Sequence, residues 1–197
     1  MKIFYMFLGV ALLAVMTQTG ASEIGSKTDL GNTLQNAVLC KPGTVDDPAA
    51  VGAFDGSDES MSDALTRLGV KVDSGDRSGD RNELYKKYTL PPGVTVFGYA
   101  AKRATFYAYL GAGSIFYVEL AADRSELIKL KNDLRLARIR KNNEDYGYRG
   151  QVDAQYYKRV HSPTAFDPYP DTIVAGYQYK GGSEFIRIGC QEFDSPG

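Results

Sequence analysis

The sequence predicts an α+β protein in which one antiparallel sheet has helices packed on one face. Apolar residues recur at helical spacing around 61–68 and 127–137, whereas they alternate at period two through most of 84–120 and 155–190. Short turn sequences, such as the Pro-Pro-Gly at 91–93, separate successive strand patterns. Turns this short join antiparallel strands, because a parallel crossover needs about a dozen residues or more. Segregated helices and antiparallel strands define the α+β class.

The first 21 residues have the pattern of a secretory signal peptide. Lys2 precedes an apolar run from Ile3 to Met16, and the small residues Gly20 and Ala21 follow. This run is shorter than the roughly 20 helical residues that a hydrocarbon core of about 30 Å requires. We therefore expect cleavage after residue 21, a mature chain without a transmembrane segment, and a periplasmic or secreted location.

The mature chain, 22–197, is expected to form a single domain. It has 22 basic and 24 acidic residues, a formal charge of −2, so no basic field favours nucleic acid as a partner. The tetrapeptides Val-Phe-Gly-Tyr at 96–99 and Val-Ala-Gly-Tyr at 174–177 are similar. A duplication into two related helix-plus-strands halves, 46–120 and 121–190, is therefore a further hypothesis.

The two cysteines, Cys40 and Cys190, are predicted to form a disulfide. An even number of cysteines in an exported protein favours pairing. Catalytic and metal-binding cysteine pairs are usually close in sequence, and these two lie near opposite ends of the mature chain. In the loop-entropy model, closing a loop of this length stabilises the fold by up to about 5 kcal/mol.

The N-terminal elements are expected in the following order. Residues 22–33 are polar and form a loose leader, and the apolar stretch 34–39 brings the first cysteine to the core. An Asp-Pro pair begins a short helix over 47–54. A second helix is capped by Ser60 and ends at Gly69.

The strands and the third helix complete the expected fold. Asp123 and Glu126 form a D-x-x-E capping box, and the longest helix runs from there to Ala137. The strand at 114–120 places Phe116 and its alternating neighbours inward. We expect strands at 70–72, 84–90, 94–99, 104–110, 114–120, 155–160, 172–179 and 184–190, and turns at 91–93, 101–103, 111–113 and 180–183.

Tyrosine is the most unusual feature of the composition, with 14 tyrosines and no tryptophan. A tyrosine side chain combines a large contact area with a hydrogen-bonding end, and several lie on strand faces opposite the apolar ones. The segment 138–149 adds arginine, the other residue type common in binding hot spots. The alternative is that tyrosine covers a half-exposed sheet and that 138–149 is a solvated loop. The candidate partner-binding residues are Tyr107, Tyr109, Tyr117, Arg138, Arg140, Lys141, Tyr146, Tyr148 and Arg149.

The residue pattern does not favour an enzyme. His161 is the only histidine. A catalytic set could be drawn with Ser162 and either Asp167 or Asp171, but neighbours in sequence rarely reach the geometry of a triad, and the chain has no G-x-S-x-G motif. We expect neither catalytic residues nor a cofactor.

Metal binding is not expected either. One histidine and two paired cysteines do not supply an ordinary zinc site. The acidic loops at 55–59 and 73–83 are the alternative, as weak calcium sites. Gly75 and Arg77 occupy positions of the second loop at which a calcium loop needs oxygen ligands.

These observations predict an exported, disulfide-containing binding protein of the bacterial envelope. Its function would be that of an inhibitor or immunity factor that occludes an envelope-targeting toxin or hydrolase. The element order is similar to that of secreted inhibitors of the β-lactamase inhibitory protein type, and this similarity implies a sheet face presented to an enzyme. The alternative is a periplasmic structural or assembly factor that binds an envelope component; a hydrolase using His161 is a third possibility.

Overall fold

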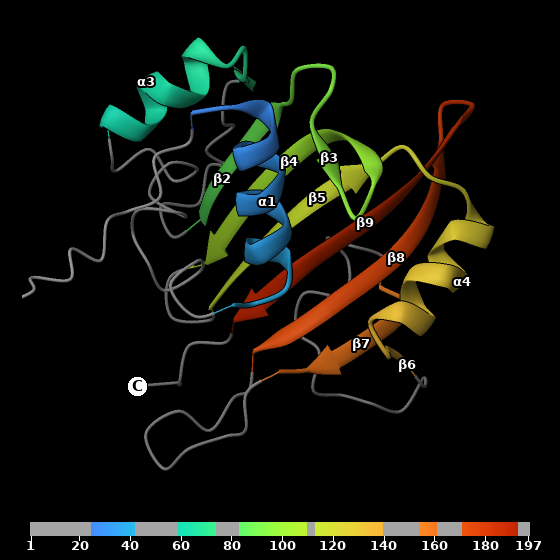
Figure 1. The fold of residues 1–197 in the computed structure, drawn as a ribbon. Helices are drawn as coiled ribbons and strands as arrows, with labels where there is room; N and C mark the ends of the chain where they lie inside the picture. Colours follow the sequence, from blue (N-terminus) through green and yellow to red (C-terminus); the bar gives the residue numbers. More distant parts are fainter. Residues whose placement is uncertain are drawn as a thin grey trace, which may run out of the picture.

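The computed structural model describes residues 25–41, 59–73, 83–109, 113–139, 154–160 and 171–192. The nine described strands form one sheet in the order β1-β2-β4-β5-β9-β8-β7-β6, and β3 pairs with β4 beside this path (Figure 1). Every pair of neighbouring strands is antiparallel. The predicted antiparallel sheet and α+β class are confirmed.

The helices are α1 (Lys27–Val38), α3 (Glu59–Arg67) and α4 (Arg124–Asp133). The strands are β1 (Lys71–Asp73), β2 (Glu83–Thr89), β3 (Thr95–Val96), β4 (Tyr99–Tyr109), β5 (Gly113–Leu120), β6 (Ala137–Arg138), β7 (Tyr156–Arg159), β8 (Thr172–Lys180) and β9 (Ser183–Glu192). None of the described helices is long and apolar enough to cross a membrane.

Helix α1 corrects the expectation of a loose leader over 22–33. Ser26 caps the helix by accepting a hydrogen bond from the Asp29 amide at 3.1 Å. One helix face then buries Leu30, Leu34 and Val38, whose spacing of four residues fits one side of a helix. The segment appears polar in sequence because its other face is exposed to water.

Helix α4 begins as predicted and ends earlier. The capping box is present: the Asp123 carboxylate accepts hydrogen bonds from the amides of Ser125 and Glu126, and the Glu126 side chain bonds to the Asp123 amide. The helix stops at Asp133 because Arg135 has a positive φ of 56°. The expected continuation to Ala137 is therefore wrong, and α1 is longer than α4.

Helix α3 and the hairpin after it differ from expectation at their ends. Helix α3 begins at Glu59, so Ser60 lies inside the helix rather than at its cap, whereas Gly69 follows the helix end as predicted and has a positive φ of 85°. The expected strand at 94–99 and turn at 101–103 are wrong. Instead, Phe97 and Gly98 have positive φ values and form the turn between β3 and β4.

A contact distant in sequence stabilises this turn. The Phe97 amide donates a hydrogen bond of 2.9 Å to the side-chain carbonyl of Gln35 in α1. The turn also shows that the two similar tetrapeptides differ in structure, because 96–99 reverses the chain whereas 174–177 lies within β8. They do not share a backbone conformation, and the two related halves stay a hypothesis.

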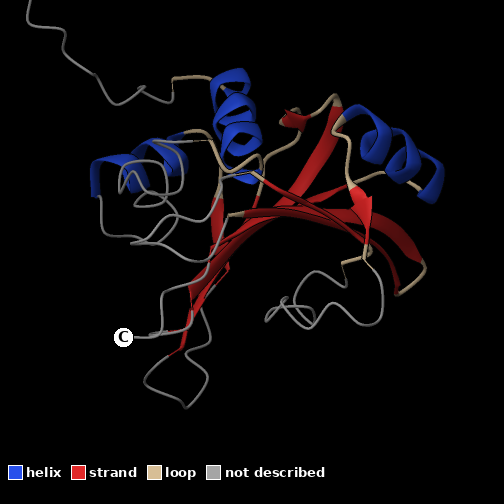
Figure 2. Ribbon diagram, turned by 90° about the horizontal axis from the view of Figure 1, so that it is seen from below, coloured by secondary structure: helices blue, strands red, loops and turns tan. Residues whose placement is uncertain are grey.

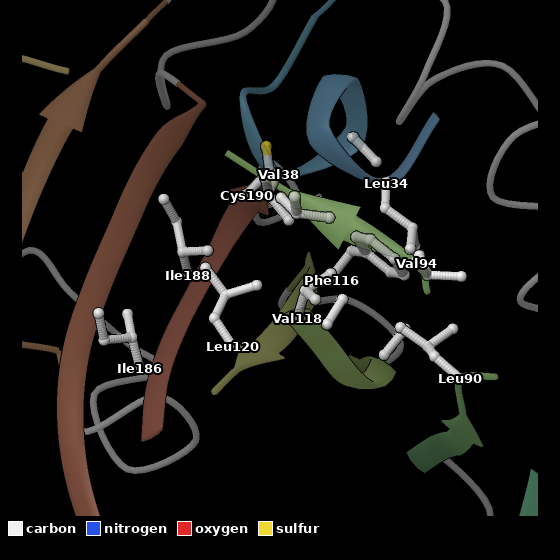
Figure 3. Close-up of a cluster of buried hydrophobic side chains, with 14 of the residues drawn as sticks. Leu34, Val38, Leu90, Val94, Phe116, Val118, Leu120, Ile186, Ile188 and Cys190 are labelled. Atoms are coloured by element: carbon white, nitrogen blue, oxygen red, sulfur yellow. The ribbon is translucent and has the colours of Figure 1, made fainter. Parts of the chain in front are cut away.

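The main core is one buried cluster that contains residues of α1, α3 and α4 together with residues of the sheet. Phe116, Val118 and Leu120 alternate into it from β5, as predicted (Figure 3). Leu34 of α1 and Leu127 of α4 belong to the same buried cluster, and Figure 2 shows both helices on the same side of the sheet.

The predicted disulfide is confirmed. Cys40, two residues after α1, is bonded to Cys190 in β9, with an S–S distance of 2.13 Å. Both cysteines are buried in the main core. The bond attaches the N-terminal helix to a central strand of the sheet.

Candidate functional site

The sheet has a second face, defined here as the side opposite the main core. Strand alternation directs Ile115 and Tyr117 of β5 and Val174 of β8 to this face, where they form a small separate cluster. Tyr107 and Tyr157 are half-buried beside it. The second face is therefore partly apolar and rich in tyrosine.

The predicted strand tyrosines differ in exposure. Tyr117 is only 3% exposed, which corrects the expectation that it is exposed, because it is packed in the cluster with Ile115 and Val174; its role in partner binding stays a prediction. Tyr107 is half-buried, and its ring packs edge to face against the ring of Tyr85, with 6.4 Å between the ring centres. Tyr109 is the last residue of β4, and its role stays a prediction.

The other predicted contact segment is described only at its start. Arg138 is exposed in β6 and pairs with Tyr156 of β7. Several candidates lie outside the described residues, and their roles stay predictions: Arg140, Lys141, Tyr146, Tyr148 and Arg149. Also outside them are the signal peptide, the expected helix at 47–54, His161 with Ser162 and Asp167, the loop at 55–58, and most of that at 73–83.

The second face also contains a pocket of 680 Å³ that the sequence did not reveal. It lies at one end of the sheet. The last residues of β2, β5 and β8 and the first residues of β4 and β9 contribute to its lining. Five of its lining residues are cationic: Lys87, Lys102, Arg103, Lys180 and Arg187.

A buried carboxylate, Glu119, belongs to the lining of this pocket. Glu119 pairs in register with Arg103 on one neighbouring strand and with Arg187 on the other. Both Nε and Nη2 of Arg187 donate to Glu119 Oε1, at 3.0 and 2.9 Å. Arg103 Nη1 lies 3.5 Å from Glu119 Oε2. These two cations compensate the cost of burying a charged carboxylate.

Aromatic rings hold Arg187 in place. Its guanidinium carbon lies 5.1 Å from the centre of the Tyr117 ring and 5.5 Å from that of Phe185, distances at which a cation is attracted to a ring face. Burial raises the pKa of Tyr117, while the Thr105 hydroxyl and the charge of Arg187 act against that rise. Tyr117 therefore acts as a neutral side chain whose ring contacts the Arg187 guanidinium.

The lining of the pocket carries a surplus of positive charge. Five cationic residues stand against two acidic ones, Glu119 and Glu184, a balance of +3 in a chain whose formal charge is −1. Strand alternation directs the Glu184 side chain to the side of the sheet that carries the main core, as it does for Ile186 and Ile188. There it acts on Tyr177, whose pKa is raised first by desolvation and then by the hydrogen bond and charge of Glu184. The pocket itself is therefore suited to an anionic group.

The strand residues that face away from the main core were the sequence feature from which this site could have been predicted. Once Phe116 and Val118 are assigned inward, alternation places Glu119 on the opposite face with the charged residues of its neighbours. The sequence does not reveal that β5 lies beside β9, and Glu119 and Arg187 are 68 residues apart.

Comparison with protein-family models, curated proteins and solved structures found no match to the chain. The architectural similarity to secreted inhibitors thus stays a prediction from element order. The function must be argued from the second face and its pocket.

Proposed function

We propose that the protein is an exported binding protein of the bacterial envelope that occludes a partner protein with the second face of its sheet. It would act as an inhibitor or immunity factor against an envelope-targeting toxin or hydrolase. The observation that carries this proposal is the cationic pocket with its fixed Arg187. The signal-peptide pattern and the disulfide support the exported location.

The pocket has the properties of a protein-binding hot spot. Arginine and tyrosine are enriched at such sites, and a side chain that is already ordered loses less entropy on binding. Arg187 is ordered by Glu119 and by two rings. The concentration of positive charge would also steer an acidic partner towards this face.

Helices packed on one side of the sheet would leave the second face for the partner. In this arrangement α1 and α4 stabilise the sheet from the core side, and the disulfide attaches α1 to it. The half-buried tyrosines beside the pocket would then extend the contact area beyond the charged residues.

Site-specific crosslinking tests the proposal. A photoreactive residue at Ser183, an exposed pocket residue, should crosslink one protein from an envelope extract of the source organism. The same group at Lys129, exposed on α4, should not. The purified partner should bind the exported form at micromolar concentration or tighter, and its toxin or hydrolase activity should fall on binding. Absence of a Ser183-specific partner at that concentration contradicts the proposal.

A structural or assembly factor is the second candidate, because the same cations would also bind an anionic envelope polymer. In that case, the exported form should sediment with purified cell-wall material, and the Arg103→Gln variant should sediment less. A Ser183-specific protein partner without cell-wall binding favours the inhibitor instead.

A further inference from the structure

The two arginines that contact Glu119 differ in how firmly they are held. Arg187 makes two hydrogen bonds of 3.0 Å or less to Glu119, and its side chain is 18% exposed. Arg103 makes a longer contact of 3.5 Å, and its side chain is 48% exposed. One guanidinium is therefore fixed and the other is accessible, although both face the same carboxylate.

Arg103 can bind an additional anion at little cost. Its distance to Glu119 exceeds the roughly 2.7–2.9 Å of a strong charge-assisted hydrogen bond. A guanidinium has five N–H donors, more than one carboxylate oxygen can accept. A half-exposed ion pair contributes little stability, so Arg103 can turn towards a ligand while Arg187 continues to neutralise Glu119.

This inference rests on the proposed binding function and identifies the chemistry of the contact. We infer that the pocket binds an acidic segment of the partner protein, that Arg103 contacts a partner carboxylate directly, and that Glu119, itself held by the ordered Arg187, is a positioning residue. Lys87, Lys102 and Lys180 surround the same pocket and attract further acidic side chains of that segment.

The charge of Glu119 favours a carboxylate over a phosphate. An anion at Arg103 lies near the Glu119 carboxylate, and the repulsion between them grows with the charge of the anion. A phosphate group carries up to two negative charges near neutral pH, whereas an aspartate or glutamate carries one. The phenyl ring of Phe185 in the lining also offers an apolar surface to the aliphatic part of a peptide side chain.

A fluorescently labelled hexaglutamate peptide is the probe. Its anisotropy should rise with the exported form of the protein, and a hexalysine peptide should give no rise. Arg103→Gln should weaken hexaglutamate binding by about tenfold or more, the factor expected for a hydrogen bond to a charged group. Lys129→Gln removes the same charge from exposed α4 and should leave the affinity unchanged. Circular dichroism checks that both variants are folded.

Salt and phosphate provide independent readouts. Binding should weaken as ionic strength rises from about 0.01 M to about 1 M, because the Debye length falls from about 30 Å to about 3 Å. Inorganic phosphate should displace the peptide no more than a simple salt does at the same ionic strength. If phosphate displaces the peptide at lower concentrations, or if Arg103→Gln binds as tightly as Lys129→Gln, the inference is overturned.

The inference and the proposed function fail in different ways. If the Ser183-crosslinked partner binds Arg103→Gln with unchanged affinity, the carboxylate contact is wrong and the binding function stands. If no partner is found while hexaglutamate binding depends on Arg103, the acidic-segment site stands and the occluding function is wrong.

Discussion

Glu119 is a carboxylate with a 7% exposed side chain in the face of a sheet, and arginines lie on both sides of it. The arrangement follows directly from register, since Arg103, Glu119 and Arg187 are direct neighbours across three strands. Opposite charges at such positions attract, whereas removal of one partner leaves a buried charge without compensation.

Replacing Arg187 with methionine should therefore destabilise the protein by about 3 kcal/mol, the lower end of the range for breaking a buried pair, because Arg103 still faces Glu119. The measurement is the free energy of unfolding in urea. The double variant Arg187→Met with Glu119→Leu should recover part of this loss, because no buried charge remains without a partner and the half-exposed Arg103 is solvated. Equal losses in the single and double variants would contradict a charge-based explanation.

Tyr117 provides a prediction on pH. Its pKa is raised from the ordinary value of 10.0, mainly by burial, so the folded protein keeps the phenol protonated at a pH where the unfolded chain loses the proton. The resulting stability is fully present below pH 10 and is lost as pH rises beyond it. Tyrosinate absorbance should show late-titrating tyrosines in the wild type, and Tyr117→Phe should lack one of them and keep that of Tyr177, whose pKa is also raised. Titration of Tyr117 at or below its ordinary pKa would contradict the assignment.

At the level of elements, the close approach of α1 to β3 depends on Gly31. A Cβ atom at this position would clash with the Thr95 carbonyl oxygen. Gly-to-Ala changes in helices usually stabilise by about 1 kcal/mol, and here we expect the opposite sign, because the helix must move away from the sheet. Thermal unfolding of Gly31→Ala should occur at a lower temperature than that of the wild type. Asn32→Ala, on the exposed side of α1, should have little effect; an unchanged or raised Tm for Gly31→Ala would refute the close approach.

The elements that could be predicted from sequence are those with local causes. The α4 capping box needs only Asp123 and Glu126, and the inward face of β5 follows from alternation. The turn at Phe97 was missed because it depends on Gln35, 62 residues earlier. Helix α1 was missed because its apolar face is narrow and its other residues are polar.

The candidate site was less predictable than the fold. Tyr107 and Tyr117 were correctly placed opposite the main core, but exposure depends on what covers that face, and Tyr117 is buried. The pocket requires the pairing of β5 with β9, which brings together residues from distant parts of the chain. No periodicity within a single strand indicates that pairing.

At the level of the whole molecule, the disulfide encloses nearly the entire sheet in one covalent loop. Cys40 and Cys190 are 150 residues apart, and the described strands lie between them except for the last two residues of β9. Reduction should lower the free energy of unfolding by up to about 5 kcal/mol, measured by urea unfolding with and without a reducing agent. Thiol labelling without reduction should find no free cysteine; labelling of both would exclude the bond in the exported protein.

This loop also determines how the molecule would carry a mechanical load. A pull applied to the two chain ends would pass from the N-terminal segment through the sulfur–sulfur bond to the C-terminal segment. The strands between Cys40 and Cys190 lie outside that path. A single-molecule stretching experiment should therefore extend only the residues before 40 and after 190 until the bond is reduced.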